Sequence, residues 1–281
     1  MSVPNLQKVL YPETIDEARG LVAAHGDKAR YYSGGVTFVF SKQTGVEELV
    51  SLSRLPLNFI KKKAGGLRIG STTLIAEMVE SRAVKSYADG ALWRAARGIG
   101  SILNRNLITV GGNLVQPFIW SDLSTVALAL GARITVRGEE ERVYDAEEFF
   151  SRIPRQLMKP ADLLTEIYFP ALPEQSRAAY EKFSLTAVDF AYLKAAIVYN
   201  GGPRYCRDIT IVIGGAALLP QRPVEAEKLM RSKRVTSKLF EKVAARAAGE
   251  IKMTRDIRCP ERSKRKICAG VIRGMLEGMK E

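Results

Sequence analysis

The chain has 281 residues, 46% of them hydrophobic and 26% charged, and its 43 Lys+Arg against 30 Asp+Glu give a net charge of +13. This length predicts two or three compact units of an ordinary globular protein. Three scattered cysteines and one histidine are too few for a four-ligand zinc site or a thiolate-held iron–sulfur cluster. No apolar run is long enough to cross a membrane, and no secretion signal opens the sequence, so we expect a cytoplasmic protein.

The positive charge is concentrated at the C-terminal end. Residues 221–281 hold 17 Lys+Arg against 8 Asp+Glu, a net of +9, which leaves +4 for the rest. Such a block suits nucleic acid or an acidic protein partner, but its composition favours the simpler interpretation of an ordinary solvated helical surface. Only one aromatic residue, Phe240, lies in this block, so nucleic acid is the weaker interpretation.

In chain order, the first predicted helix begins at Thr14, which can cap it together with Glu17, and ends at Gly26. A strand over residues 28–32 follows and leads directly into Ser33-Gly34-Gly35. This glycine pair therefore lies at the end of a strand, where backbone N–H groups become free of the sheet.

A hairpin comes next, because Ala64-Gly65-Gly66 separates Phe59-Ile60 from the strand-like Leu67-Arg68-Ile69. Apolar spacing predicts helix over most of residues 74–97, with a break near Asp89-Gly90. We read residues 105–112 as a short strand that ends in a second glycine pair, Gly111-Gly112.

The remaining elements divide at a polar, proline-containing segment. Before it we predict a helix at 123–130 and strands at 132–137 and 162–169. After it we predict strands at 180–184 and 208–213, a strand or helix at 191–199, and helices at 235–251 and 263–279. The expected units are 1–172, with subdomains of about 1–60 and 61–172, and a C-terminal α+β unit at 173–281.

The two glycine pairs are the candidate site. A glycine pair at a strand end lets consecutive N–H groups point at one phosphate, and two such turns can hold a diphosphate between them. Ser33 and Thr37 beside the first pair, and Thr109 and Asn113 beside the second, add uncharged donors. A single Gly-Gly is more often an ordinary tight turn, so the argument depends on the two pairs together.

Other nucleotide and hydrolytic sites find little support. No GxxxxGK[ST] occurs, and Gly98-Ile99-Gly100 lacks the third glycine of a Rossmann fingerprint. The lone His25 permits no Ser-His-Asp set, and it is most simply a residue at a helix C-terminus. Redox chemistry would therefore require a bound organic cofactor.

Several stretches resemble, in order and over nearly the whole chain, the FAD-binding medium subunit of the molybdenum hydroxylases. They are Tyr31 to Phe38, Leu67 to Gly70, Asn104 to Asn113, Ser121 to Leu123, Leu128 to Ala132, Asp162 to Leu164, Glu181 to Phe183, Asp189 to Ala191 and Ile213 to Ala216. That family includes xanthine dehydrogenase, carbon monoxide dehydrogenase and aldehyde oxidoreductases. The chain departs from it at Ser33, where Ala is usual, and at Val36, where Thr or His is usual.

The resemblance implies an α+β protein: a two-subdomain FAD-binding fold of the vanillyl-alcohol oxidase type, then a C-terminal domain with a small antiparallel sheet and helices. It also implies a division of roles among the residues. The FAD diphosphate would be held by Tyr31, Tyr32, Ser33, Gly34, Gly35, Val36, Thr37 and Phe38, and by Thr109, Val110, Gly111, Gly112 and Asn113. Asp122 would bond the ribityl or phosphate region, Ile99 and Leu164 would pack on the ring system, Lys182 would approach the flavin, and Tyr192 would shield one ring face. Without the resemblance, Asp122 reads equally well as a helix N-cap, and Tyr192 as a core aromatic.

By this resemblance the chain is an electron-transfer component and no self-sufficient enzyme. A large molybdopterin subunit would oxidise the substrate, a small subunit with two 2Fe-2S clusters would relay electrons, and the FAD would pass them to NAD or another acceptor. The lack of cysteine clusters argues against the benzoyl-CoA reductase branch, whose flavin subunit carries an inserted cluster. Two alternatives stay open: a self-contained flavin oxidase of the same fold, and a basic nucleic-acid-binding protein.

Overall fold

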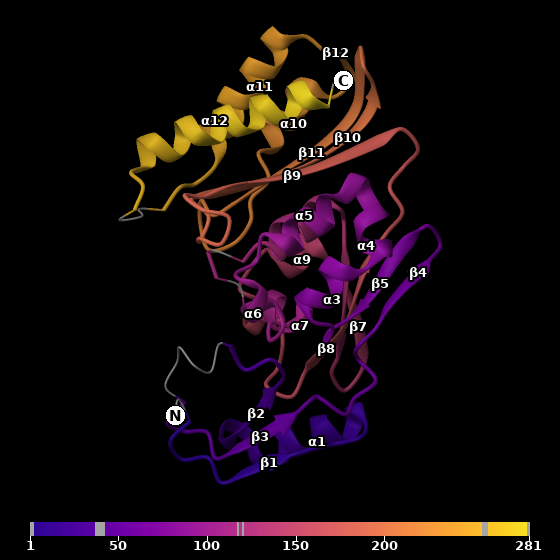
Figure 1. The fold of residues 1–281 in the computed structure, drawn as a ribbon, viewed down its shortest axis with the longest axis vertical. Helices are drawn as coiled ribbons and strands as arrows, with labels where there is room; N and C mark the ends of the chain where they lie inside the picture. The colour runs from indigo at the N-terminus through magenta and orange to yellow at the C-terminus, as the bar shows by residue number, and fades with distance from the viewer. Residues whose placement is uncertain (1–2, 37–42, 117, 120, 255–257, 280–281) are drawn as a thin grey trace.

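The computed structural model describes the chain except for residues 1–2, 37–42, 117, 120, 255–257 and 280–281. Three sheets are stacked along the long axis of the molecule (Figure 1). The N-terminal sheet lies at the bottom of the view, a larger sheet with several short helices occupies the middle, and the C-terminal sheet lies at the top under three helices. None of the described helices is long and apolar enough to cross a membrane.

The N-terminal sheet has three parallel strands in the order β1-β3-β2. Its elements are β1 (Lys8–Leu10), α1 (Ile15–His25), η1 (Gly26–Lys28), β2 (Ala29–Tyr32) and β3 (Glu48–Ser51). Helix α1 is confirmed with its predicted cap, because Thr14 Oγ1 accepts from the N–H of Glu17 at 3.1 Å. It ends at Gly26, whose φ of 53° suits glycine. The sequence missed β1 and β3.

The middle sheet has five antiparallel strands in the order β4-β5-β8-β6-β7. They are β4 (Ile60–Lys63), β5 (Gly66–Gly70), β6 (Arg133–Arg137), β7 (Glu141–Asp145) and β8 (Leu163–Phe169). The predicted hairpin is confirmed, since β4 pairs with β5 across a turn in which Ala64 and Gly65 have φ of 47° and 75°. Strand β7 was not predicted.

Short helices surround this sheet. They are α3 (Ile75–Glu80), α4 (Arg82–Ser86), η2 (Tyr87–Gly90), α5 (Ala91–Arg97), α6 (Ile102–Arg105), α7 (Val110–Val115), α8 (Leu123–Ala129), α9 (Ala146–Phe149) and η3 (Pro154–Gln156). The helical prediction for 74–97 is confirmed in kind, although Ser81 ends α3 and caps α4, which divides it further than expected. The break near Asp89-Gly90 is present as η2.

The strand predicted over residues 105–112 is wrong. Two short helices, α6 and α7, occupy this region, and each has a hydroxyl N-cap: Ser101 Oγ accepts from Asn104 N–H and Thr109 Oγ1 from Gly112 N–H. The β-branched run Ile108-Thr109-Val110 favoured a strand, but capping by Thr109 turns the chain into a helix instead. Gly111 and Gly112 therefore lie in the first turn of a helix.

The C-terminal unit is a four-stranded antiparallel sheet, β12-β11-β10-β9, covered on one side by three helices. Its elements are β9 (Ser176–Phe183), β10 (Leu193–Gly202), β11 (Tyr205–Gly214), α10 (Val224–Met230), β12 (Lys233–Arg234), α11 (Ser237–Glu250) and α12 (Glu261–Gly278). The segment 191–199, which the sequence left open, is strand. Helices α11 and α12 match the two predicted helices, and α10 was not predicted.

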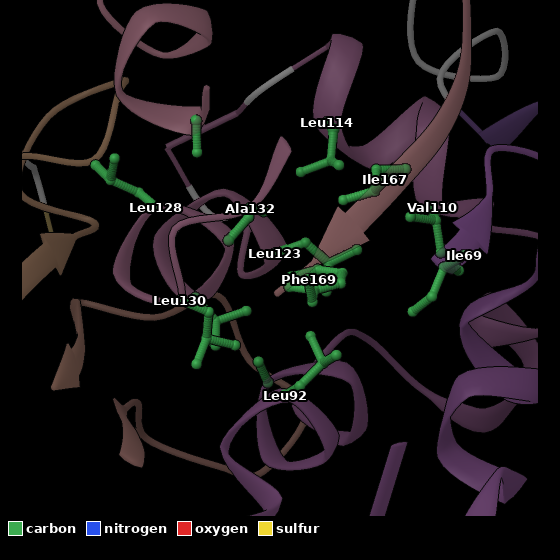
Figure 2. Packing of buried hydrophobic residues seen from close by; sticks show 14 of the residues in the cluster. Ile69, Leu92, Val110, Leu114, Leu123, Leu128, Leu130, Ala132, Ile167 and Phe169 are labelled. Carbon is green, nitrogen blue, oxygen red and sulfur yellow. The ribbon is translucent and has the colours of Figure 1, made fainter. Parts of the chain in front are cut away.

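The two faces of this sheet pack against different partners. One face, with Leu193, Ala195 and Ile197, joins an apolar core with the C-terminal helices. The opposite face contributes Tyr180 and Val212 to the core of the middle unit. Figure 2 shows the centre of that second core, where buried side chains from four elements converge: Leu92, Leu114, Leu123, Ile167 and Phe169. The C-terminal sheet is thus buried against the middle unit, which carries the second glycine pair.

Strand β9 forms one edge of the sheet. The outward N–H of Ala178 donates to Asp89 Oδ2 at 2.9 Å. Asp89 lies in a left-handed stretch, in which Ala88, Asp89 and Gly90 have φ of 51°, 50° and 75°. Beyond this contact, β9, α5 and α12 line a groove of about 960 Å³.

Candidate functional site

The first glycine pair follows β2 at the edge of the N-terminal sheet. The Tyr32 side chain packs against Gly35: a Cβ added to Gly35 would lie 2.8 Å from Tyr32 Oη. Gly35 itself has a left-handed φ of 73°. None of the described residues accepts a hydrogen bond from the backbone N–H groups of residues 33–36. Toward the part of the chain that the structure describes, this segment therefore presents a run of N–H groups without acceptors beside a left-handed turn, which is the geometry of a phosphate-binding nest.

The first segment touches the second. A Cβ added to Gly34 would lie 1.6 Å from the carbonyl oxygen of Leu107 and 2.7 Å from its carbonyl carbon. Only glycine permits this backbone contact. The structure thus brings together the two segments that the sequence singled out, which lie about 75 residues apart in the chain.

The second glycine pair uses its own N–H groups internally. Val110 N–H donates to Thr73 O at 2.9 Å, Gly111 N–H to Ser71 O at 2.8 Å, and Gly112 N–H to Thr109 Oγ1 at 3.2 Å. Asn113 N–H donates to Thr109 O at 3.0 Å. Its N–H groups are therefore not available to a ligand, and this segment can bind one only through side chains. The second pair thus does not form a phosphate-binding nest.

Two buried polar atoms at the second segment have no hydrogen-bond partner among the described residues: Asn113 Oδ1 within the segment, and Ser71 Oγ directly after β5, which packs against it. Ser71 packs against Gly111, where an added Cβ would lie 2.8 Å from Ser71 Cβ. A buried polar atom without a partner is costly unless a ligand or water satisfies it. Unused donors on one segment and unsatisfied side-chain atoms on the other fit the polar diphosphate and sugar of a dinucleotide.

A second polar cluster lies where the C-terminal sheet meets α8. Asp122, 3% exposed at the start of α8, accepts a short hydrogen bond from the hydroxyl of Tyr180. Burial, and then Asp122, raise the pKa of Tyr180 well above its usual value, so this hydroxyl stays protonated and donates. Asp122 makes no capping bond to α8. The alternative of a helix cap is therefore wrong for its side chain, which faces the cluster.

Two lysines complete this cluster. Lys182 Nζ donates to Gly98 O at 2.5 Å and lies 3.9 Å from Asp122 Oδ2. Lys194, opposite it on the next strand, is 1% exposed and donates to Ser121 O at 2.6 Å and Ile119 O at 3.2 Å. Burial lowers the pKa of Lys194 to about 8, although Asp122 opposes this shift. The cluster holds two ammonium groups against one carboxylate.

Hydrogen bonds from two side chains to backbone carbonyls connect the glycine segments with the polar cluster around Asp122. Arg105 Nη1 donates to the carbonyl oxygens of Arg97, Ile99 and Gly100 at 2.8 to 3.1 Å. Arg105 thereby fixes the turn after α5 against α6, while Lys182 holds Gly98 in the same turn from the other side. A continuous series of contacts runs from the first glycine pair through Leu107 to Asp122.

Of the three residues expected at the ring system, Ile99 and Leu164 lie in one apolar core and Tyr192 lies outside it. Ile99 and Leu164 are 5% and 2% exposed and belong to the same buried cluster. Tyr192 is half-buried, with its ring 6.4 Å from that of Phe183 and the Arg258 guanidinium 5.2 Å from its centroid. Tyr192 is thus outside the apolar cores. Of the diphosphate-binding candidates, Thr37 and Phe38 lie outside the described residues.

Sequence reasoning missed Ser71 and Lys194. Ser71 opens a run of three hydroxyl residues, Ser71-Thr72-Thr73, directly after β5, and such a run at a strand end was available as a signal. Lys194 is a single charge in the otherwise apolar stretch Leu193 to Val198. A lone lysine in a buried strand needs a partner, and that rule would have found it.

Comparison with known proteins gives a family match over both parts of the chain. Residues 5–172 match the model described as FAD binding domain in molybdopterin dehydrogenase. Residues 178–279 match the model described as CO dehydrogenase flavoprotein C-terminal domain.

Individual relatives agree with these matches. The chain is 26% identical over 251 residues to the glyceraldehyde dehydrogenase medium chain of Sulfolobus acidocaldarius, covering 88% of each. It is 25% identical over 244 residues to the carbon monoxide dehydrogenase medium chain of Hydrogenophaga pseudoflava, covering 85% of this chain and 83% of that one. Its fold matches a chain of reconstituted CO dehydrogenase from Oligotropha carboxidovorans with a TM-score of 0.91 at 24% identity, covering 100% of this chain and 99% of that one. It also matches a chain of quinoline 2-oxidoreductase from Pseudomonas putida 86 with a TM-score of 0.90 at 17% identity, covering 100% and 98%.

Proposed function

The chain belongs to the FAD-binding medium subunits of the molybdenum hydroxylases, the family of CO dehydrogenase and xanthine dehydrogenase, and from this premise we propose that it transfers electrons within such a complex. Its FAD would take electrons from a 2Fe-2S small subunit and pass them to an external acceptor, while a molybdopterin-binding large subunit oxidises the substrate. The relatives supporting this division are themselves medium chains or subunits of multi-subunit dehydrogenases. We also propose the division into units at 1–172 and 173–281.

One observation carries the assignment of the cofactor to these residues. None of the described residues accepts from the N–H groups of residues 33–36, and in the same part of the chain Asn113 Oδ1 and Ser71 Oγ are buried without partners. The Gly34 to Leu107 contact joins the two segments. We propose that the diphosphate of FAD binds the N–H groups of the first segment and that Asn113 and Ser71 bind its polar parts from the second.

The remaining residues orient the cofactor. Asp122, held by the Tyr180 hydroxyl, is an acceptor for hydroxyl groups of the ribityl or ribose. Lys182 provides a positive charge at the end of the C-terminal sheet, next to Ile99 and the turn after α5. When bound, FAD supplies the ability to accept electrons singly or in pairs, which the side chains of this chain lack. Leu164 and Tyr192 are proposed to border the ring system on its apolar sides.

The absence of cysteine clusters supports a component that depends on partners. The chain's cysteines, Cys206, Cys259 and Cys268, are each buried and free of disulfides. Burial raises the pKa of Cys206 and of Cys268 to about 12, which disfavours the thiolates that ligate iron. We propose that electrons reach this flavin from a cluster on another chain.

Rapid mixing of the FAD-loaded chain with its reduced 2Fe-2S subunit tests the proposal. We expect the flavin absorbance near 450 nm to bleach on mixing, and the bleached flavin to be reoxidised by an added acceptor. Substrate alone, without the molybdopterin and 2Fe-2S subunits, should leave the flavin oxidised. Direct reduction by substrate in the isolated chain would instead identify a self-contained oxidase, and absence of FAD from the assembled complex would refute the assignment.

A further inference from the structure

The buried lysine Lys194 is not needed to form the sheet it belongs to. Its strand neighbours on the same face, Ala196 and Val198, are apolar. Burying an ammonium group costs free energy that a methionine of similar length would not. Lys194 also requires space on β11: a Cβ on its partner Gly214 would lie 3.2 Å from Lys194 Cε and 2.1 Å from Thr125 Oγ1.

Within the described residues, the Lys194 side chain makes two hydrogen bonds, and both acceptors belong to the flavin-binding unit. Its ammonium group donates to the carbonyl oxygens of Ile119 and Ser121, which lie shortly before α8. Ser121 immediately precedes Asp122. Lys182, directly opposite on β9, binds Gly98 O, and Gly98 immediately precedes Ile99. Each lysine of the pair therefore fixes, through a backbone carbonyl, the residue before a proposed FAD contact.

We propose that Lys194 is a positioning residue for FAD: it holds Ile119 and Ser121 so that Asp122 faces the cofactor, and so makes FAD binding depend on docking of the C-terminal sheet. Lys194 acts only through these two carbonyl groups, whereas Lys182, which also binds a carbonyl, is proposed to approach the cofactor as well. This inference rests on the proposed flavin site.

Two charged groups, Asp122 and Lys182, together with burial set the charge state of the ammonium. Asp122 lies on the α8 side, where Thr125 is uncharged, and Lys182 and Tyr180 lie on β9. On the β11 side stands Gly214, which carries no charge. Burial and the nearby Lys182 favour the neutral amine, whereas Asp122 favours the ammonium. Tyr180 stays protonated, whereas Lys194, with its pKa lowered to about 8, loses its proton in the mildly alkaline range.

The test is a titration of the full chain, alone and in complex with its partner subunits, with FAD at several pH values. For Lys194→Met we expect the dissociation constant for FAD at pH 7 to rise about tenfold, since charged hydrogen bonds to two carbonyls are lost. For the wild type we expect the dissociation constant to rise between pH 7 and 9.5 as the amine loses its proton. In Lys194→Met that pH dependence should be absent.

A matched control is Lys264→Met. Lys264 is also fully buried in the C-terminal unit and also donates to a backbone carbonyl, Gly215 O at 3.4 Å, but that carbonyl follows β11 and does not belong to the segment before α8. We expect wild-type FAD affinity and pH profile in this variant. If Lys194→Met binds FAD as the wild type does, or if both variants weaken binding equally with an unchanged pH profile, the inference is wrong while the proposed function stands. If the wild type binds no FAD, either alone or in complex with its partner subunits, both this inference and the proposed function are wrong.

Discussion

The two Gly-Gly pairs are identical in sequence, but the physical constraint that requires glycine differs between them. At Gly34-Gly35 the first residue allows a backbone contact with Leu107 and the second adopts a left-handed φ, and none of the described residues accepts from the neighbouring N–H groups. At Gly111-Gly112 neither residue has a positive φ, and the N–H groups are bonded to Ser71 O and Thr109 Oγ1. A dipeptide pattern therefore locates a region of close approach, but only the backbone hydrogen bonds tell which of two such regions is free to bind an anion.

Substitution of Gly34 by Ala should have the largest effect. The new Cβ would lie 1.6 Å from a carbonyl oxygen, so the backbone of one segment must move. We expect the free energy of unfolding to fall by about 3 kcal/mol or more and FAD binding to be lost. Urea unfolding and FAD fluorescence titration measure the two effects. Wild-type FAD binding in this variant would show that the two segments need not touch.

Gly111→Ala should rank second. Its Cβ would meet Ser71 Cβ at 2.8 Å and Ser71 O at 2.9 Å, in a buried position with no positive φ to strain. Overpacking of this kind predicts a loss of about 2 kcal/mol in stability. FAD affinity should fall because Ser71 and Asn113 are displaced. The same urea and fluorescence measurements apply, and Gly20→Ala, on α1 where an added Cβ meets open space, provides a control with no expected loss.

Gly35→Ala should cost about 1 kcal/mol, since an L-residue is strained at a φ of 73°. The Cβ would also displace the Tyr32 ring, 2.8 Å away. Because the distortion falls on the segment with unused N–H groups, FAD affinity should drop more than stability does. If the free energy of FAD binding and the free energy of unfolding fell by the same amount, the assignment of the phosphate to this segment would be contradicted.

Gly112→Ala should have the smallest effect. The residue is exposed, and its Cβ meets only Thr109 Oγ1, at 2.9 Å. The gain in helix propensity and the disturbed cap of α7 are each worth about 1 kcal/mol and oppose one another. We expect little change in stability and wild-type FAD affinity. Strong loss of FAD with unchanged stability would place the phosphate on the second pair after all.

Much of the fold followed from local signals. Helix α1 was predicted with its cap, and the β4–β5 hairpin from its glycine turn, because both depend on interactions within a few residues. The parallel strands β1 and β3 were missed, as each is at most four residues long and is stabilised by pairing across the chain. Residues 105–112 were misread because β-branched residues outweighed the cap at Thr109.

The candidate site was partly predictable for the same reason. The sequence singled out both glycine segments, Asp122 and Lys182, and the structure connects them through contacts. The sequence could not show that the N–H group of Gly111 is occupied, because its acceptor, Ser71 O, lies 40 residues away and reaches it only through the fold. Lys194 is visible in the sequence as a lone charge in an apolar stretch, but its partners are backbone carbonyls, which no side-chain pattern reveals.

The left-handed turn at Ala88 to Gly90 has a consequence for solubility. Edge strands expose hydrogen-bonding groups on which a strand from another molecule can pair and start aggregation. By placing the Asp89 carboxylate on the N–H of Ala178, the turn puts a negative charge where such an incoming strand would have to bind. The strained backbone of this turn thus protects the sheet that docks on the flavin-binding unit from pairing with a copy of itself.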